Sequence, residues 1–321
     1  MANLTTIPDH FAIMFENSWQ LLLQQLDARL KDRVKLVQAQ GASVRFNQMA
    51  PTTMNAVTTR GAATPQSDIS MPARWAFPTP FDIASVIDEF DELFLGQVSN
   101  PSSEILQSQV AAYNRTVDST IINAILNPAT ISTSGATTAG IPSTTTVPFD
   151  TTNQLVKVDR VPFGGTNVNS GLTIDKVRYA KYKLDHAEAP HEDRILVVSA
   201  AEIADLLSST EVTNQLYNSV RALVDGDVDS FLGFKIVRSE LLPVITSTTN
   251  TANSTITGNF RQVVAYSKNA VTLVDGGRKT YMDILPTQSH NLQIRSTAVL
   301  GAPFSMRRVA PRTAVLRIWR L

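Results

Sequence analysis

The hydrophobic and polar positions repeat with different periods in successive parts of the chain. Between residues 11 and 38, apolar residues recur every three or four positions, the period that gathers them on one side of an α-helix. Gly41 follows, as glycine often does after a last helical turn. We therefore expect an amphipathic N-terminal helix whose apolar face must pack on another surface. Its stripe consists of Phe11, Met14, Phe15, Trp19, Leu22, Leu26, Leu30 and Val34.

The next segment, residues 42–80, has too few branched apolar residues to form a core of its own. A strand can begin at Val44, but threonine, alanine, proline and methionine dominate until Trp75 and Phe77. Long connections without a core are uncommon in compact domains and are usually functional or disordered. Two interpretations stay open: an extended hairpin that lies on a neighbouring subunit, or a flexible surface loop. We take Trp75 and Phe77 as candidate contact residues between subunits.

The strongest single element is a helix predicted over residues 101–126. Asn100 can cap its first turn and Pro101 suits the first helical position. Asn127 and Pro128 end it, because proline has no amide hydrogen to donate. At a rise of ~1.5 Å per residue the helix is about 39 Å long. Its apolar stripe consists of Leu106, Val110, Tyr113, Val117 and Ile121.

The middle of the chain divides into a polar stretch and an α/β block. Residues 129–171 are rich in Thr, Ser, Gly and Pro, and predict loops with one or two short strands near Leu155. Residues 172–243 then alternate helix and strand patterns, which predicts an α/β domain with its own core. The expected elements are a helix capped by Thr173 and ending near Ala187, a strand at 194–198, a helix begun by the capping box of Ser199 and Glu202, a helix at about 216–226, and a strand at 231–238.

The C-terminal part is predicted to be mostly strand, after a Thr/Asn/Ser loop at 246–259. The expected strands are 262–266, 271–274, 281–285, 292–296 and 313–319.

Composition and charge add limits to this picture. Apolar residues make up 43% of the chain and charged residues only 17%, a low charge density that suits a surface covered by neighbouring subunits and equally a threonine-rich monomer. The net charge of zero hides an asymmetry: from Arg261 onward there are ten basic and two acidic residues, whereas the first hundred residues contain ten acidic and seven basic ones. Such a separation can pair neighbouring copies, face nucleic acid, or be neutralised within one molecule.

Arginine is concentrated near the C-terminus. Its guanidinium can pair bidentately with carboxylate or phosphate. Three roles stay open for this cluster: salt bridges across subunit contacts, contact with DNA, or a solvated surface. The cluster is Arg307, Arg308, Arg312, Arg317 and Arg320, of which we take Arg307, Arg308 and Arg312 as candidate inter-subunit contacts.

No motif for catalysis, metal binding or cofactor binding is intact in this sequence. Cysteine is absent, which excludes disulfides, Cys-ligated zinc and thiol catalysis. His186 and His191 match no common zinc spacing, and the run that begins at Asp225 lacks the glycine and glutamate of a calcium loop. No phosphate-binding loop or nucleophile elbow occurs. We therefore expect no catalytic residues, no metal and no cofactor, and neither a membrane span nor a signal peptide.

The order of these elements resembles the Hong Kong 97-type fold of tailed-bacteriophage major capsid proteins. The predicted elements of this chain and the fold of that family share an N-terminal arm, a core-poor loop, a long helix, an α/β block and closing strands. Residues 110–122 (VAAYNRTVDSTII) are similar to the long spine helix of phage capsid families. The resemblance covers about residues 40–321. Its other stretches are 194–199, 231–239 and 241–243, which resemble the axial domain, and 270–271 and 301–302, where the family returns to its closing strands.

The resemblance implies an α+β fold of five segments. Residues 1–43 form an N-terminal arm with a helix, and residues 44–80 form an extended β-hairpin loop that overlaps the next subunit. Residues 81–171 form the peripheral domain with the spine helix. Residues 172–280 form the α/β axial domain, which meets its copies around five- and six-fold centres. Residues 281–321 supply strands that return to the peripheral domain.

The implied function is that of a structural subunit and not of an enzyme. Pentamers and hexamers of the chain would enclose double-stranded DNA, bound non-specifically, in an icosahedral virion assembled in the host bacterial cytoplasm. Expected partners are further copies of the chain and scaffolding, portal and decoration proteins, with no membrane. A fused scaffolding segment is not expected, because no long charged helix precedes the arm.

Some members of the resembling family crosslink a loop lysine to an asparagine of a neighbour. Residues 42–80 contain no lysine, so we expect a shell held together without covalent links. Two rival hypotheses remain: an encapsulin-like nanocompartment shell that encloses cargo enzymes, and an α/β enzyme of unrecognised class.

Overall fold

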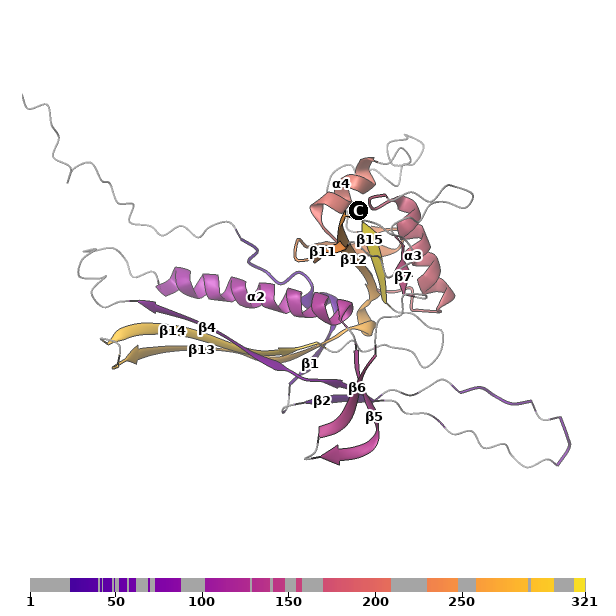
Figure 1. Cartoon of the computed structure of the whole chain (residues 1–321), viewed down its shortest axis with the longest axis horizontal. Coiled ribbons are helices and arrows are strands. Elements are labelled where there is room, and N and C mark those ends of the chain that lie inside the picture. The colour runs from indigo at the N-terminus through magenta and orange to yellow at the C-terminus, as the bar shows by residue number, and fades with distance from the viewer. Residues whose placement is uncertain are drawn as a thin grey trace, which may run out of the picture. The chain divides into compact units, whose positions relative to one another are not determined.

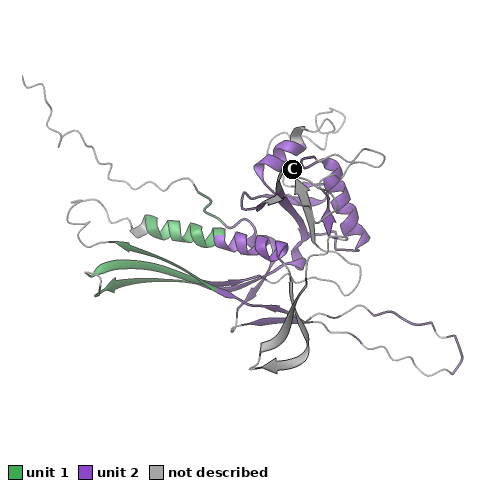
Figure 2. Ribbon diagram, viewed as in Figure 1, with its two compact units in different colours: residues 1–27, 80–115, 278–298 green, residues 28–79, 116–277, 299–321 purple. Residues whose placement is uncertain are grey.

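The structure, a computed structural model, contains two compact units, each assembled from three separate segments of the chain (Figure 2). Unit 1 comprises residues 1–27, 80–115 and 278–298, and unit 2 comprises residues 28–79, 116–277 and 299–321. The residues that the structure describes are 24–39, 41, 43–47, 49, 52–56, 58–61, 69, 73–87, 102–127, 129–138, 141–147, 154–157, 170–208, 230–247, 258–287, 290–302 and 315–320.

Unit 1 combines the first half of a long helix with the outer parts of long strands (Figure 1). The helix α2 (Ser102–Leu126) lies along β4 (Thr79–Ile87), β13 (Thr272–Leu285) and β14 (Asn291–Gly301). These strands are neighbours in a sheet of order β1-β13-β14-β4. The fourth strand, β1 (Lys35–Gln38), belongs to unit 2, where it pairs in parallel with the first residues of β13.

A buried glutamine fixes α2 to the sheet of unit 1. The side-chain amide of Gln109 donates to the carbonyl oxygen of Ile294 at 3.0 Å and to Ser85 Oγ at 3.3 Å. Its Oε1 accepts a hydrogen bond from Ser296 Oγ at 2.7 Å. Because a buried amide without partners destabilises a fold, these bonds specify one arrangement of the helix on its strands.

Unit 2 is centred on a sheet of seven strands with helices α3 (Ile174–His186) and α4 (Ala200–Ser208). The strand order is β7-β15-β12-β8-β10-β9, and β11 pairs with β12. β8 is parallel to β10 and antiparallel to β12, and all five of its residues are buried. The strands are Leu155–Val156 (β7), Arg194–Val198 (β8), Ser230–Phe231 (β9), Phe234–Arg238 (β10), Val244–Ser247 (β11), Gly258–Ser267 (β12) and Val315–Arg320 (β15).

The hydrophobic core of this part of unit 2 gathers around α3 and the central strands. Val177, Ala180 and Leu184 recur at helical spacing on α3 and are fully buried. They belong to one cluster with Leu196 of β8 and Phe234 of β10. The predicted α/β block with its own core is therefore present.

A third sheet, also in unit 2, contains four strands in the order β2-β3-β5-β6. β2 (Val44–Asn47) and β3 (Ala73–Ala76) are antiparallel and enclose the residues between them as a hairpin. β5 (Ala129–Thr138) pairs with β3 on one side and with β6 (Ile141–Val147) on the other. The strand predicted to begin at Val44 is confirmed.

The N-terminal helix predicted over residues 11–38 is wrong where the structure describes it. Residues 24–38 contain a 3-10 turn, η2 (Lys31–Arg33), and the strand β1. Leu30 and Val34 are buried as the periodicity required, but backbone pairing of β1 with residues 272–275 of β13 replaces the helix. A distant strand edge thus overrides a local pattern. Residues 11–23 lie outside the described residues.

The prediction that residues 129–171 are mostly loop is wrong for the first part of this segment. Its first part forms the long hairpin of β5 and β6, because threonine is β-branched and favours strands when a neighbouring strand is available. The short strand near Leu155 is confirmed as β7. The first two residues of the polar loop expected at 246–259 belong instead to β11, which pairs with β12.

The long helix predicted at 101–126 is confirmed as α2. Among the closing strands, the two expected at 271–274 and 281–285 are one continuous strand, β13. The last strand, β15, lies between β7 and β12 in the seven-stranded sheet of unit 2, so it does not follow β13 and β14 into their sheet as expected. The helix expected at 216–226 lies outside the described residues.

The sequence predicted the starts of α3 and α4 correctly, but the side-chain caps expected there are only partly formed. Thr173 has the extended backbone of an N-cap without a side-chain hydrogen bond to the helix. In the expected capping box, the Ser199 amide donates to a Glu202 carboxylate oxygen. Ser199 Oγ has no hydrogen-bond partner, so only the glutamate half of the box exists.

A buried carboxylate on α2 holds the N-terminal segment within unit 2. Asp118 is fully buried and accepts hydrogen bonds from the amides of Arg29 and Leu30, each at 3.0 Å. The neighbouring side chain of Arg29 donates to the carbonyl oxygen of Arg238 at 2.8 Å. Burial, and secondarily the charge of Asp118, raise the pKa of the buried Tyr266 hydroxyl above its usual value.

Replacing Asp118 with alanine is predicted to free this segment, because the buried amide of Leu30 and the part-buried amide of Arg29 lose their acceptor. The free energy of unfolding, measured with urea, should fall by about 2–4 kcal/mol, and the amides of Arg29 and Leu30 should exchange hydrogen faster. Asp175→Ala, which removes an exposed pair with Arg178, should cost less than about 1 kcal/mol. Equal losses in the two variants would contradict the anchoring role of Asp118.

Candidate assembly surfaces

At the base of the β2–β3 hairpin, the predicted contact residue Trp75 lies next to the cationic side chain of Arg45. Arg45 and Trp75 are direct partners in the strand register, and the Arg45 guanidinium lies 5.9 Å from the centre of the Trp75 ring, within range of a cation–π interaction. Trp75 Nε1 is buried, and no described residue accepts its hydrogen. A buried donor without an acceptor is costly, so a contact that supplies one would be favoured.

Apolar side chains are exposed along this hairpin. Phe77 follows β3 directly and is 42% exposed. Met49, Met54 and Ile69, in the connection between the two strands, are also exposed. Trp75 belongs to β3 and Phe77 follows it, so both residues are at the base of the hairpin, and their role as contacts between subunits stays a prediction. Arg307, Arg308 and Arg312 lie outside the described residues.

An ion pair that the sequence did not reveal crosses the sheet of unit 1. Arg295 on β14 binds Asp82 on β4 bidentately, through Nε to Oδ1 at 3.0 Å and Nη2 to Oδ2 at 2.6 Å. This hydrogen bonding holds the pKa of Asp82 below its usual value and raises the pKa of Arg295. Both side chains are about half exposed, so the pair specifies strand pairing more than it stabilises the unit.

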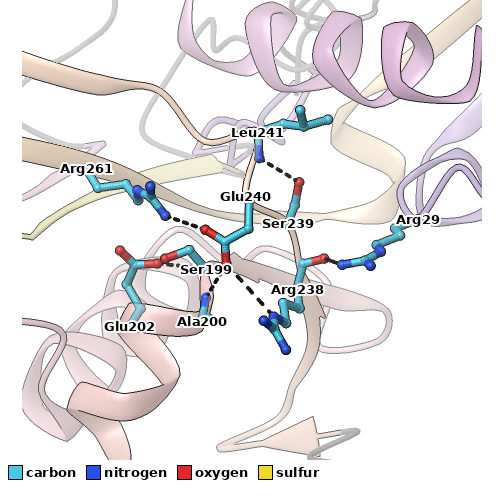
Figure 3. Close-up of polar contacts among 9 residues, drawn as sticks. All are labelled: Arg29, Ser199, Ala200, Glu202, Arg238, Ser239, Glu240, Leu241 and Arg261. Atoms are coloured by element: carbon cyan, nitrogen blue, oxygen red, sulfur yellow. Dashed lines mark hydrogen bonds and ion pairs between the residues drawn. The ribbon is translucent and has the colours of Figure 1, made fainter. Parts of the chain in front are cut away.

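A second polar cluster ties three elements of unit 2 together at Glu240 (Figure 3). Glu240 Oε1 accepts from the amide of Ala200 at the start of α4, at 2.7 Å, and Oε2 accepts from Arg261 Nη1 of β12 at 2.8 Å. Arg238, at the end of β10, lies 3.9 Å from Oε1. The Ala200 amide is the main cause that lowers the pKa of Glu240, with Arg261 and Arg238 contributing.

Histidine and acidic side chains do not gather into a metal site in the part of the chain that the structure describes. No group of three His, Asp or Glu side chains among them is placed to hold a metal ion. His191 instead lies 3.4 Å from Asp185, and His186 stacks on Tyr182. Within the same residues, no helix is long and apolar enough to cross a bilayer.

Comparison with known proteins places this α+β architecture among capsid folds. Solved structures that it resembles include the capsid of cyanophage P-SCSP1u (16% identity, TM-score 0.70, covering 100% of this chain and 97% of that chain). The head structure of Helicobacter pylori bacteriophage KHP40 has 14% identity, a TM-score of 0.69, and coverage of 99% and 98%. The chain of Mycobacterium phage Che8 has 16% identity, a TM-score of 0.63, and coverage of 99% and 98%. At such low identity these likenesses establish the fold.

The family follows from the sequence match. Residues 7–305 match the family model described as phage capsid protein, and the chain belongs to this family. No curated protein matches the chain. The protein is therefore a structural capsid subunit that associates with its own copies in the shell of a phage head, and the virion is its location. The capsid function and α+β fold expected from the sequence are confirmed.

The Glu240 cluster predicts a specific acid sensitivity. Because its pKa is lowered in the folded chain, Glu240 contributes stability above its unfolded pKa of about 4.3, and this contribution is lost as pH falls through the folded value. Glu240→Gln should therefore be less stable than the native chain at pH 6, with the difference shrinking toward pH 3. Urea unfolding at each pH measures it. Glu192→Gln, at an exposed loop position, is the control and should track the native chain, while a pH-independent gap for Glu240→Gln would contradict the prediction.

Proposed function

We propose that this chain is a major capsid protein of the Hong Kong 97 type, whose pentamers and hexamers enclose double-stranded DNA in an icosahedral head. The observation that carries the proposal is the β2–β3 hairpin, an extended element that exposes apolar side chains at its base and along its length. Exposed apolar side chains clustered on one element are typical of a surface covered by a partner, and the family match makes another copy of the chain the partner of choice.

The parts of the fold correspond to this proposal. Residues 44–80, with the hairpin, are the extended loop, and α2 is the spine helix. The sheet of β4, β13 and β14 with α2 forms the peripheral domain. The seven-stranded sheet with α3 and α4 forms the axial domain, to which we now assign β15 as well, because it pairs with β12 and β7.

We further propose a purely geometric mode of action without catalysis or covalent crosslinks. Residues 42–80 contain no lysine that could form a link to a neighbour, so apolar and ionic contacts must hold the shell. DNA would be held non-specifically. Scaffolding, portal and decoration proteins would be further partners, and assembly would take place in the host cytoplasm. The C-terminal residues Arg307, Arg308 and Arg312 remain proposed inter-subunit contacts, since arginine pairs well with carboxylates.

Expression of the full chain in bacteria, with and without its phage scaffolding protein, tests the proposal. We expect closed shells with pentameric and hexameric units in electron micrographs. Nucleic acid inside shells isolated from phage supports the DNA role, whereas cargo protein inside them would favour a nanocompartment. A monodisperse 35.0 kDa species that never assembles under either condition would overturn the proposal.

Phe77 provides a residue-level test of the loop contact. Phe77→Ser is predicted to leave the subunit folded and to raise the concentration at which shells form by about tenfold or more. Burying a phenylalanine contributes about 1.5–3 kcal/mol, and ~1.4 kcal/mol corresponds to a tenfold change in an equilibrium constant. Light scattering over a concentration series measures the threshold.

The matched control is Tyr182→Ser, because Tyr182 is an aromatic residue of α3 that is 58% exposed and lies outside the proposed contact. Its shells should form at the native concentration. Equal shifts for the two variants, or no shift for Phe77→Ser, would contradict a contact at the hairpin base.

A further inference from the structure

Two carboxylates of unit 2 are each shared by more than one cationic side chain. Glu240 accepts a hydrogen bond from Arg261 at 2.8 Å and lies 3.9 Å from Arg238 (Figure 3). Asp193, which directly precedes β8, accepts a hydrogen bond from Lys235 Nζ at 2.6 Å. All four of these acceptors and cations except Arg261 and its partner on β12 lie at or beside β8 and β10.

Two further cations lie close to Asp193. The backbone amide of Lys268 donates to the carbonyl oxygen of Asp193 at 3.0 Å. The pKa of Asp193 is held below its usual value, mainly by the hydrogen bond from Lys235 and to a smaller extent by the charges of Lys268 and Arg33. Because a charge shifts a carboxyl pKa appreciably only at short range, both cationic side chains lie near this carboxylate.

The N-terminal segment and β10 join these two groups of charges. Arg29 Nη1 donates to the carbonyl oxygen of Arg238 at 2.8 Å, and Arg33 follows in the same segment, at the end of η2. β10 carries both Lys235 and Arg238, about 10 Å apart along the strand. The cations therefore form one surface of unit 2, here called the basic surface. It consists of Arg29, Arg33, Lys235, Arg238, Arg261 and Lys268.

The basic surface carries more positive charge than its acidic neighbours neutralise. Its six cations share Asp193 and Glu240, and the exposed Asp32 and Glu192, which adjoin it in the sequence, bring the acids to four. The whole chain, by contrast, contains 28 basic and 28 acidic residues. Four of the six cations are exposed and the other two are partly exposed. Such a local excess of accessible positive charge attracts anions.

The composition of the surface favours phosphate over another protein as the partner. Interfaces between proteins usually have an apolar core, whereas interfaces with DNA are more polar and more positively charged. Among the residues that the structure describes, no large exposed apolar side chain occurs within 28–34, 192–200, 230–241 or 261–270. Four of the six cations are arginine, whose guanidinium pairs bidentately with phosphate.

We propose that the basic surface binds the phosphate backbone of double-stranded DNA without reading its sequence. The inference rests on the proposed function, because it gives the DNA contact named there a place on the subunit. Phosphate contacts carry no sequence information, so the same surface can hold any part of a packaged genome. Asp193 and Glu240 compete with phosphate for the cations that they bind.

Binding of short fluorescent DNA duplexes to the unassembled full-length subunit tests the proposal. The variant Arg33→Gln/Lys235→Gln/Arg238→Gln removes three charges of the basic surface. Between about 50 and 200 mM salt, the slope of log affinity against log salt should become shallower by about 3. We also expect the affinity to fall by about tenfold or more, equally for duplexes of unrelated sequence. Fluorescence anisotropy measures both quantities.

The matched control is Lys157→Gln/Arg178→Gln/Lys279→Gln, which removes three exposed charges outside the basic surface. Its salt slope should equal that of the native chain. Asp193→Asn separates a loss of charge from a loss of fold, because it removes a competitor of phosphate for Lys235. This variant should bind DNA more tightly than the native chain, which a misfolded subunit would not do.

Two outcomes would overturn the proposal. The first is an equal loss of DNA affinity in the two triple variants. The second is an unchanged affinity of the basic-surface variant together with a raised concentration for shell formation, which would assign the surface to acidic side chains of another copy.

The test also separates this inference from the proposed function. If native shells form but the basic-surface variant binds DNA like the native chain, the inference fails and the capsid proposal stands. If the native chain never forms shells but the variant loses DNA affinity as expected, the capsid proposal fails and the basic surface stands as a DNA-binding site.

Discussion

The fold depends on polar side chains that α2 buries and that only distant segments can satisfy. Gln109 requires atoms of Ile294 and Ser296, and Asp118 requires the amides of Arg29 and Leu30. An apolar helix face would pack on several surfaces with similar energy, but a buried amide or carboxylate without its partners costs free energy that few arrangements can recover. These two residues therefore favour a single pairing of α2 with its strands and with the N-terminal segment, one in each unit.

The sequence predicted the elements whose signals are local. α2, α3, β8 and β10 emerged from periodicity, helix punctuation and short buried runs, and the structure contains all four. The helix predicted for residues 35–38 was wrong, because these residues pair with the edge of β13, which lies more than two hundred positions away in the sequence. The loop predicted in place of the threonine-rich strands β5 and β6 was wrong for a related reason. The sequence of a polar strand resembles that of a loop until its partner strand is known.

The same distinction applies to the candidate surfaces. Trp75 and Phe77 stood out because large aromatic residues are conspicuous in a segment that cannot bury them. Asp82 and Arg295, by contrast, are unremarkable charges in the sequence, and only the pairing of the neighbouring strands β4 and β14 brings them together. The capsid role follows the same logic: it was inferred from elements that lack a core of their own, and surfaces that a single chain leaves uncovered are what a shell of many chains can bury.

The chain passes between its two units five times, after residues 27, 79, 115, 277 and 298. During translation neither unit can be completed as a continuous piece, because β4 must wait for β14, which is made some two hundred residues later. At ~5–20 residues per second this delay is about 10–45 s. A nascent chain therefore carries β4 with the strand edge that faces β14 unpaired until β14 has been synthesised. Interleaving of the two units thus makes the folding of each depend on segments that are synthesised far apart in time.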